Sequence, residues 1–250
     1  MTQFTFPELR AIPLFSELDD AAAERVAASV MINSFPPKTV LYRQNARGRF
    51  LYAILSGEVE FGATQGGAAS TVLLGTPGFL FPLPSVLSDT PSLLSAKTLR
   101  RSRLAMMPDE ALRRWMTDYP CVARGIIDCL AGTTKVLMAD LLEARFSTSL
   151  ERFARWLLRQ TLPNGPDSQT IQLSLQRRQI AALLGMSPES LSRSIAVLQK
   201  HGVKFDGQTV TITSIAELET QAPYRRLLDD GDQERWMKGL ALGSEAMQRL

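Results

Sequence analysis

The chain has 250 residues, of which 45% are hydrophobic and 21% are charged, as in an ordinary globular protein large enough for two domains. Its net charge of +3 is too small to indicate a nucleic-acid partner, so such a role depends on local basic clusters. The two cysteines, Cys121 and Cys129, exclude a disulfide framework and a four-thiolate iron-sulfur cluster. We expect a cytoplasmic, reducing environment.

Neither export nor a membrane span is expected. Residues 1–10 lack a basic region followed by an apolar core, and prolines interrupt the apolar run from Val72 to Leu87.

The first element expected is a short leading helix from Phe15 to Met31. Its apolar residues have four-residue spacing; they are Leu18, Ala22, Val26 and Val30.

From Ile32 to Leu104 the pattern changes to short apolar or alternating runs between Gly and Pro residues. This pattern predicts an all-β barrel or roll. The runs are Thr39–Tyr42, Phe50–Leu55, Val59–Phe61 and Ser70–Leu74.

Within this β region the segment Gly78–Pro84 is apolar. It has two interpretations, a pocket for a small hydrophobic effector or a filled core. The candidate pocket residues are Phe79, Phe81, Leu83 and Leu93.

Asp118 and Pro120 predict the start of a long helix that runs to about Arg145. Because it carries more than one apolar stripe, it needs two partners. One stripe is expected to cover the β region and the other to pair with the same helix of a second subunit; the alternative is burial within one subunit. The predicted interface residues are Ile126, Cys129, Thr133, Val136 and Asp140.

A separate helix is expected from Ser149 to Gln160. Thr148 and Glu151 have the spacing of a capping box, and Pro163-Asn164-Gly165 ends the segment. Residues 146–148 are therefore the expected hinge.

The segment from Gln176 to Thr213 has the pattern of a winged helix-turn-helix. A helix Arg177–Leu184 stops at Gly185, and a second begins at Pro188 after the N-cap Ser187. A β-hairpin follows, in which Val203–Phe205 and Val210–Ile212 flank a turn at Asp206-Gly207.

A helix-turn-helix directs the first residues of its second helix to base edges in the major groove. Those residues are Glu189, Ser192 and Arg193. A carboxylate accepts from cytosine, a guanidinium binds guanine and a hydroxyl serves either base type. The alternative is a winged helix that serves as a protein-binding adaptor.

The string Gly185–Arg193, GMSPESLSR, resembles the recognition segment of the CRP/FNR superfamily of bacterial transcription regulators. Its E-x-x-S-R spacing is similar to the FNR branch, which reads a TTGA-type half-site. A looser likeness extends from about Leu14 to Leu218.

The resemblance implies an α+β fold with an N-terminal β-roll of the cyclic-nucleotide-binding type, a long dimerisation helix and a C-terminal winged helix. The corresponding domains are 1–117, 118–147 and 148–220, and the tail 221–250 has no assigned role.

The implied function is that of a homodimeric, sequence-specific regulator on a palindromic DNA site, with RNA polymerase as a further partner. Arg177 matches the family's phosphate-contacting arginine, and we also predict phosphate contacts from Ser187, Ser190 and Lys200.

The effector site departs from the family pattern. LYAILSGEVEF resembles the central hairpin of the roll, with Ser56-Gly57-Glu58 at its turn, but Pro82-Leu83 and Thr90-Pro91 replace the Gly-Glu and Arg-Ser pairs of nucleotide binders. No basic residue lies between Arg49 and Lys97, so a buried phosphate would lack a counter-ion. We expect an effector other than a cyclic nucleotide, or none.

Other chemistries have weaker signals. His201 is the single histidine, which does not suffice for a haem or metal site. Thiol or haem sensing of redox state or gas remains an alternative. No catalytic constellation is visible, and we expect no enzyme activity, cofactor or metal.

Overall fold

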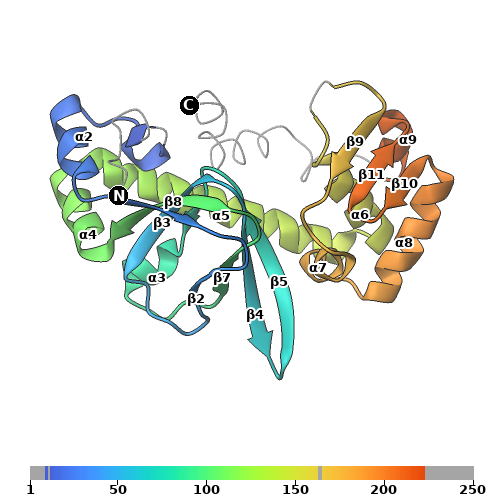
Figure 1. Ribbon diagram of the computed structural model, residues 1–250, viewed down its shortest axis with the longest axis horizontal. Helices are drawn as coiled ribbons and strands as arrows, with labels where there is room; N and C mark the ends of the chain where they lie inside the picture. The colour runs from blue at the N-terminus through green and yellow to red at the C-terminus, as the bar shows by residue number, and fades with distance from the viewer. Residues whose placement is uncertain (1–8, 11, 163–164, 223–250) are drawn as a thin grey trace. The chain divides into compact units, whose positions relative to one another are not determined.

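The computed structural model describes residues 9–10, 12–162 and 165–222. These form two compact units, one up to Val136 and the other from Leu137 (Figure 1). Residues 223–250 of the tail lie outside the described residues. Within the described part of the chain, no helix has the length and apolarity needed to cross a bilayer.

Two four-stranded antiparallel sheets build the described part of the first unit, in the orders β1-β8-β3-β6 and β2-β7-β4-β5. They confirm the predicted β-roll (Figure 1). The strands are β1 Met31–Phe35, β2 Val40–Tyr42, β3 Phe50–Ser56, β4 Val59–Gln65, β5 Ala68–Gly75, β6 Leu80–Phe81, β7 Ser95–Thr98 and β8 Ser102–Pro108.

The expected hairpin between β3 and β4 is wrong. β3 pairs with β6 and β8, whereas β4 pairs with β5 and β7, so the chain crosses from one sheet to the other at Gly57. Gly57 has a φ of +94°, and a Cβ there would lie 2.6 Å from the Cα of Ser102. Only glycine fits this close crossing.

An aromatic cluster fills the space between the two sheets. Phe81 stacks on Tyr52 at 5.1 Å between ring centroids and meets Phe61 edge-on at 4.8 Å. Phe79 packs against the same cluster. Of the two interpretations of the apolar segment Gly78–Pro84, these contacts favour a filled core over a pocket.

The four candidate effector residues do not form one pocket. Phe81 lies in the aromatic cluster, but Leu83 belongs to the other hydrophobic core of the unit. Leu93 is 81% exposed, so its place in the pocket was wrong. The strand that carries Phe81 ends at that residue, and a helix begins at Leu83, so the two side chains do not share one strand face.

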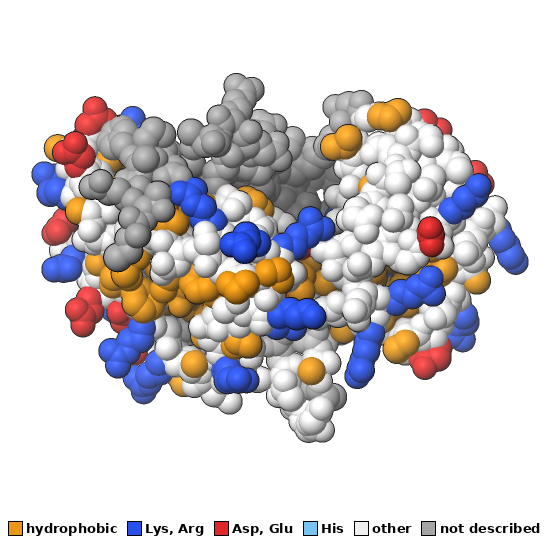
Figure 2. All heavy atoms as spheres, in the orientation of Figure 1, with side chains coloured by type: hydrophobic (Ala, Val, Ile, Leu, Met, Phe, Trp, Pro, Cys, Tyr) orange, Lys and Arg blue, Asp and Glu red, His pale blue; other side chains and the backbone are white. Residues whose placement is uncertain are grey.

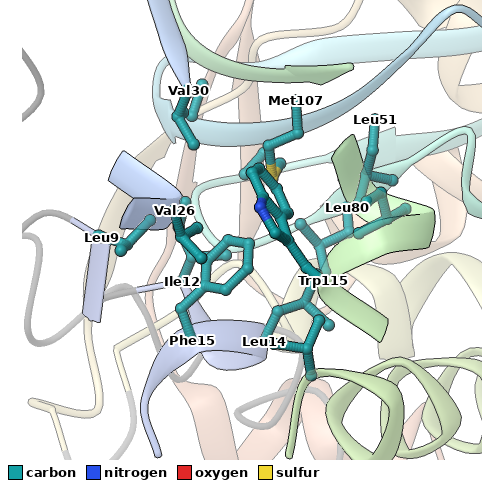
Figure 3. Close-up of a cluster of buried hydrophobic side chains, with 14 of the residues drawn as sticks. Leu9, Ile12, Leu14, Phe15, Val26, Val30, Leu51, Leu80, Met107 and Trp115 are labelled. Carbon is teal, nitrogen blue, oxygen red and sulfur yellow. The ribbon is translucent and has the colours of Figure 1, made fainter. Parts of the chain in front are cut away.

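The second core of this unit lies between β3, β8 and the surrounding helices (Figure 3). Leu51 and Met107 face it from the strands, and Phe15 meets Trp115 edge-on at 5.6 Å. The helical elements are η1 Pro13–Phe15, α2 Asp20–Ala27, α3 Leu83–Ser88 and α4 Asp109–Asp118. The predicted leading helix thus begins later than expected, because Asp19 accepts a hydrogen bond from the amide of Ala22 and caps α2.

The long helix α5 runs from Pro120 to Phe146 and confirms the predicted element. Ile126 is 1% exposed and belongs to the core of the first unit, so its predicted place at a subunit interface was wrong. The position of Gly125 explains the packing, since a Cβ there would lie 3.2 Å from the Cα of Leu14.

The exposed apolar side of α5 is rotated by about one residue from the predicted stripe. It carries Ile127, Leu137, Met138 and Leu141, between 48% and 64% exposed. Ile127, Thr134 and Leu141 are seven residues apart along the sequence. Cys129 packs partly against the core, while Thr133 and Val136 are half-buried and Asp140 is exposed.

The second unit combines a helical cluster with a three-stranded sheet of order β10-β11-β9 in its described part. Its elements are α6 Ser149–Leu158, β9 Gln169–Gln172, α7 Arg177–Leu183, α8 Pro188–Lys200, β10 Val203–Asp206, β11 Thr209–Ile212 and α9 Ile215–Thr220. The capping box of α6 is present, with the Thr148 amide donating to Glu151 at 2.6 Å. The sequence did not predict β9, which is short and pairs with β11.

Candidate nucleic-acid interface

The turn between α7 and α8 is fixed by local chemistry. Gly185 takes a φ of +58° after α7, a backbone region that favours glycine. Ser187 then caps α8 by accepting from the amide of Ser190 at 3.2 Å, and Pro188 occupies the first turn. Both helices and the turn lie where the sequence predicted them.

One side of α8 is buried and the other is exposed. Leu191, Ile195 and Leu198 are at most 7% exposed and attach the helix to its own unit. Glu189, Ser192 and Arg193 are all exposed near its start. The hypothesis that these three residues contact bases requires this exposure, because a base-reading side chain has to be free to enter a groove.

Glu189 and Arg193 have complementary charges on adjacent turns of α8. The pKa of Glu189 is held below its ordinary value, chiefly by a hydrogen bond from its own backbone amide, with smaller contributions from the Ser187 hydroxyl and Arg193. The carboxylate therefore stays ionised near neutral pH and can accept hydrogen bonds.

Hydrogen bonds within α8 orient its first turns. An Nη of Arg193 donates to the hydroxyl of Ser190 at 3.2 Å, and Ser192 donates to the carbonyl of Pro188 at 2.9 Å. Ser190 is half-buried, and its hydroxyl also accepts a hydrogen bond from the Ser187 hydroxyl at 3.2 Å. In this arrangement Ser190 supports the guanidinium.

The predicted phosphate contacts lie at the ends of the two helices. Arg177 is exposed at the first position of α7, and Lys200 is exposed at the last position of α8. Figure 2 shows Lys and Arg side chains projecting from the part of the second unit that carries α7 and α8.

Two arginines that the sequence analysis missed hold this unit together. Arg152 donates to the carbonyls of Ser147 at 2.7 Å and Leu184 at 3.1 Å, which joins the predicted hinge to the end of α7. Arg155 lies buried against Glu143, with 3.0 Å between Nε and Oε1. Arginines on an amphipathic helix are usually solvated, so their pattern gave no signal of burial.

The surroundings of Cys129 and His201 can be compared with what redox or metal chemistry requires. Burial, and then the charge of Asp128, raise the pKa of Cys129 to about 11, which disfavours the thiolate that redox chemistry needs. His201 lies 3.3 Å from a carboxylate oxygen of Glu217. Among the described residues, no three His, Cys, Asp or Glu side chains are grouped as a metal site.

Two protein families match separate parts of the chain. The model of the Crp-like helix-turn-helix domain matches residues 151–221, and that of the cyclic nucleotide-binding domain matches residues 32–119. These ranges coincide with the winged-helix unit and the β-roll.

Two relatives align with most of this chain and with nearly all of their own length. The CRP-like cAMP-activated global transcriptional regulator of Mycobacterium tuberculosis is 25% identical over 84% of this chain and 96% of its own length. The cyclic AMP receptor protein of Thermus thermophilus is 28% identical over 84% and 97%.

Among solved structures, the c-di-GMP responsive global regulator CLP of Xanthomonas campestris has the same fold. It has a TM-score of 0.67 and 21% identity, and the match covers 78% of this chain and 100% of that chain. The two domain matches, the nearly full-length relatives and the shared fold show that the chain belongs to the CRP/FNR superfamily of bacterial transcription regulators.

Proposed function

We propose that the protein is a cytoplasmic, homodimeric, sequence-specific DNA-binding regulator whose α8 reads a palindromic, TTGA-like site. The observation that carries this proposal is the exposure of Glu189, Ser192 and Arg193 on the early turns of a helix whose other side is buried. A good bidentate contact with a base contributes roughly 1–3 kcal/mol of discrimination.

Phosphate contacts supply the remaining affinity in this proposal. Arg177 is exposed at the first position of α7 and Lys200 at the last position of α8, and the Ser187 and Ser190 hydroxyls lie between them along the chain. Such contacts orient a protein on the duplex without reading its sequence.

The exposed apolar side of α5 supports pairing of two copies. Ile127, Thr134 and Leu141 repeat at the seven-residue spacing of a helical pair, and Leu137 and Met138 widen the apolar surface. A two-fold dimer places its recognition helices about 34–36 Å apart, one turn of the duplex. RNA polymerase is the further partner we expect.

The interior of the β-roll argues against a cyclic nucleotide as effector. Aromatic rings fill the space between the sheets, and Lys97 is paired with Glu60 at 2.8 Å while Arg47 is paired with Asp89 at 3.3 Å. Two relatives are named for cAMP, but a phosphate buried in this roll would need a cationic partner, and no basic residue lies between Arg49 and Lys97.

A gel-shift titration with a TTGA-containing palindrome and a scrambled duplex tests the proposal. We expect Arg193→Ala to weaken binding to the palindrome by roughly ten- to a hundredfold and to change binding to the scrambled duplex much less. Arg101→Ala, which removes an exposed arginine of the first unit, is the charge-matched control. Equal affinity for both duplexes, unchanged by Arg193→Ala, would favour the protein-binding adaptor instead.

A further inference from the structure

The second unit contains a crevice that neither the fold nor the base-reading surface explains. It lies between the start of α7, the buried side of α8 and the wing formed by β10 and β11, and its volume is about 190 Å³. An apolar cavity of about 150 Å³ is large enough to hold benzene. The crevice therefore has room for one small ring.

The walls of the crevice are mainly apolar. Phe153 of α6, Ile180 of α7, Ile195 of α8 and Phe205 of β10 contribute side chains from four different elements. Water in such a space finds few hydrogen-bond partners, so an apolar group can displace it at little cost.

A cation stands at the rim of this apolar space. Arg177 lines the crevice, and its side chain is exposed. Across the residues that the structure describes, no ion pair to Arg177 is found, whereas Arg155 and Arg159 of the same unit are both paired with Glu143. The neighbouring Arg178 is also exposed but does not line the crevice.

Apolar walls with one guanidinium at the mouth define a ligand class. We propose that this crevice binds a small aromatic or alicyclic carboxylate of the size of benzoate, with the ring among the apolar side chains and the carboxylate on Arg177. Arg177 serves this ligand well because a guanidinium pairs with a carboxylate through two hydrogen bonds.

A ligand in this crevice would control DNA binding from within the DNA-binding unit. This regulatory role rests on the proposed function, in which Arg177 contacts a DNA phosphate. A carboxylate bound to Arg177 withholds that contact, so ligand and DNA compete for one side chain, and the coupling is reciprocal.

The binding step can be tested without DNA by methyl NMR of the full-length protein titrated with benzoate. We expect saturable shifts of the Ile180 and Ile195 methyl signals, each assigned by its Ile→Val variant. Ile54 lies in the aromatic cluster of the roll and should not move. If benzoate shifts the Ile54 signal instead, or leaves Ile180 and Ile195 unmoved up to its solubility limit, the proposed site is wrong.

Variants of Arg177, the arginine at the rim of the crevice, provide a second test. Arg177→Gln should weaken benzoate binding about tenfold, the typical effect of losing a charged hydrogen-bond partner. It should leave benzyl alcohol, which has no carboxylate, unaffected, and Arg178→Gln should leave benzoate binding unchanged. Equal losses in Arg177→Gln and Arg178→Gln would show a general charge effect and contradict the assignment.

Gel shifts with and without benzoate separate this inference from the proposed function. Weaker DNA binding with benzoate, lost in Arg177→Gln, supports both. Methyl shifts in a protein that binds no DNA would leave the site intact and contradict the proposed function. Methyl shifts with unchanged DNA affinity would contradict the competition for Arg177.

Discussion

Arg155 and Glu143 form a buried ion pair, with Nε and Oε1 3.0 Å apart and side chains only 5% and 9% exposed. The pair joins the end of α5 to α6, and Arg159 contacts the other carboxylate oxygen at 3.3 Å. All three residues belong to the second unit, so the buried pair secures the last turns of α5 to α6 within that unit.

Glu143→Gln should lower the free energy of unfolding by about 3–5 kcal/mol, because it leaves the Arg155 charge buried without its counter-ion. Urea denaturation measures this. Replacing both partners with Glu143→Leu and Arg155→Met should recover most of the loss. Arg47→Gln, which breaks an exposed pair, should cost under about 1 kcal/mol; equal losses in both single variants would contradict the role of burial.

The salt dependence of DNA binding should reveal phosphate contacts. Arg177→Gln should reduce the slope of log affinity against log salt concentration by about 1 for each subunit, because one fewer counter-ion is released. Filter binding at several salt concentrations measures the slope. An unchanged slope, like that expected for Arg101→Gln, would remove Arg177 from the phosphate contacts.

Leu141→Glu should convert a dimer into monomers, because it places a charge in the apolar side of α5 that we propose pairs two copies. Sedimentation velocity measures the mass. Leu93→Glu makes the same change at a leucine of the β-roll that is 81% exposed and should leave the mass unaltered. A dimer that persists in Leu141→Glu would place the interface elsewhere.

The thiol of Cys129 should react slowly with iodoacetamide at pH 8 in a Cys121→Ser background. Burial raises its pKa to about 11, so the reactive thiolate is scarce at pH 8 and its fraction rises as the pH approaches 11. Mass spectrometry of timed samples gives the rate. A rate at pH 8 equal to that of free cysteine would instead favour thiol sensing.

Cyclic AMP should leave the melting temperature of the protein unchanged, because a ligand that does not bind the folded state cannot stabilise it. The reason lies in the filled roll interior and in the pairing of Lys97 with Glu60. Differential scanning fluorimetry over a range of cyclic AMP concentrations checks this. A concentration-dependent rise would show that the roll opens for the nucleotide.

Local signals made the winged helix predictable. Gly185, Ser187, Pro188 and the Thr148 capping box each act on their own turn, and each lies where the sequence placed it. Recognition-helix exposure followed from the same information, since the spacing of Leu191, Ile195 and Leu198 determines which side of α8 is buried.

Contacts between residues that are far apart in the sequence could not be predicted from these local signals. The sequence showed that the long helix has more than one apolar side, but only packing against Leu14 decided that Ile126 turns inward and Ile127 outward. The Gly57 crossing and the exposure of Leu93 depend in the same way on which strands pair and which sheet a side chain faces.

By itself the sequence determined the order of most elements, the ends of the capped helices and which side of α8 is exposed, because caps, turns and helical spacing act within a few residues. Only the tertiary structure decided which arginines are buried, which side of α5 is exposed and that a crevice lies beside Arg177. Those outcomes depend on contacts between residues that are far apart in the sequence and meet only in the folded chain. The local residue pattern therefore could not predict them.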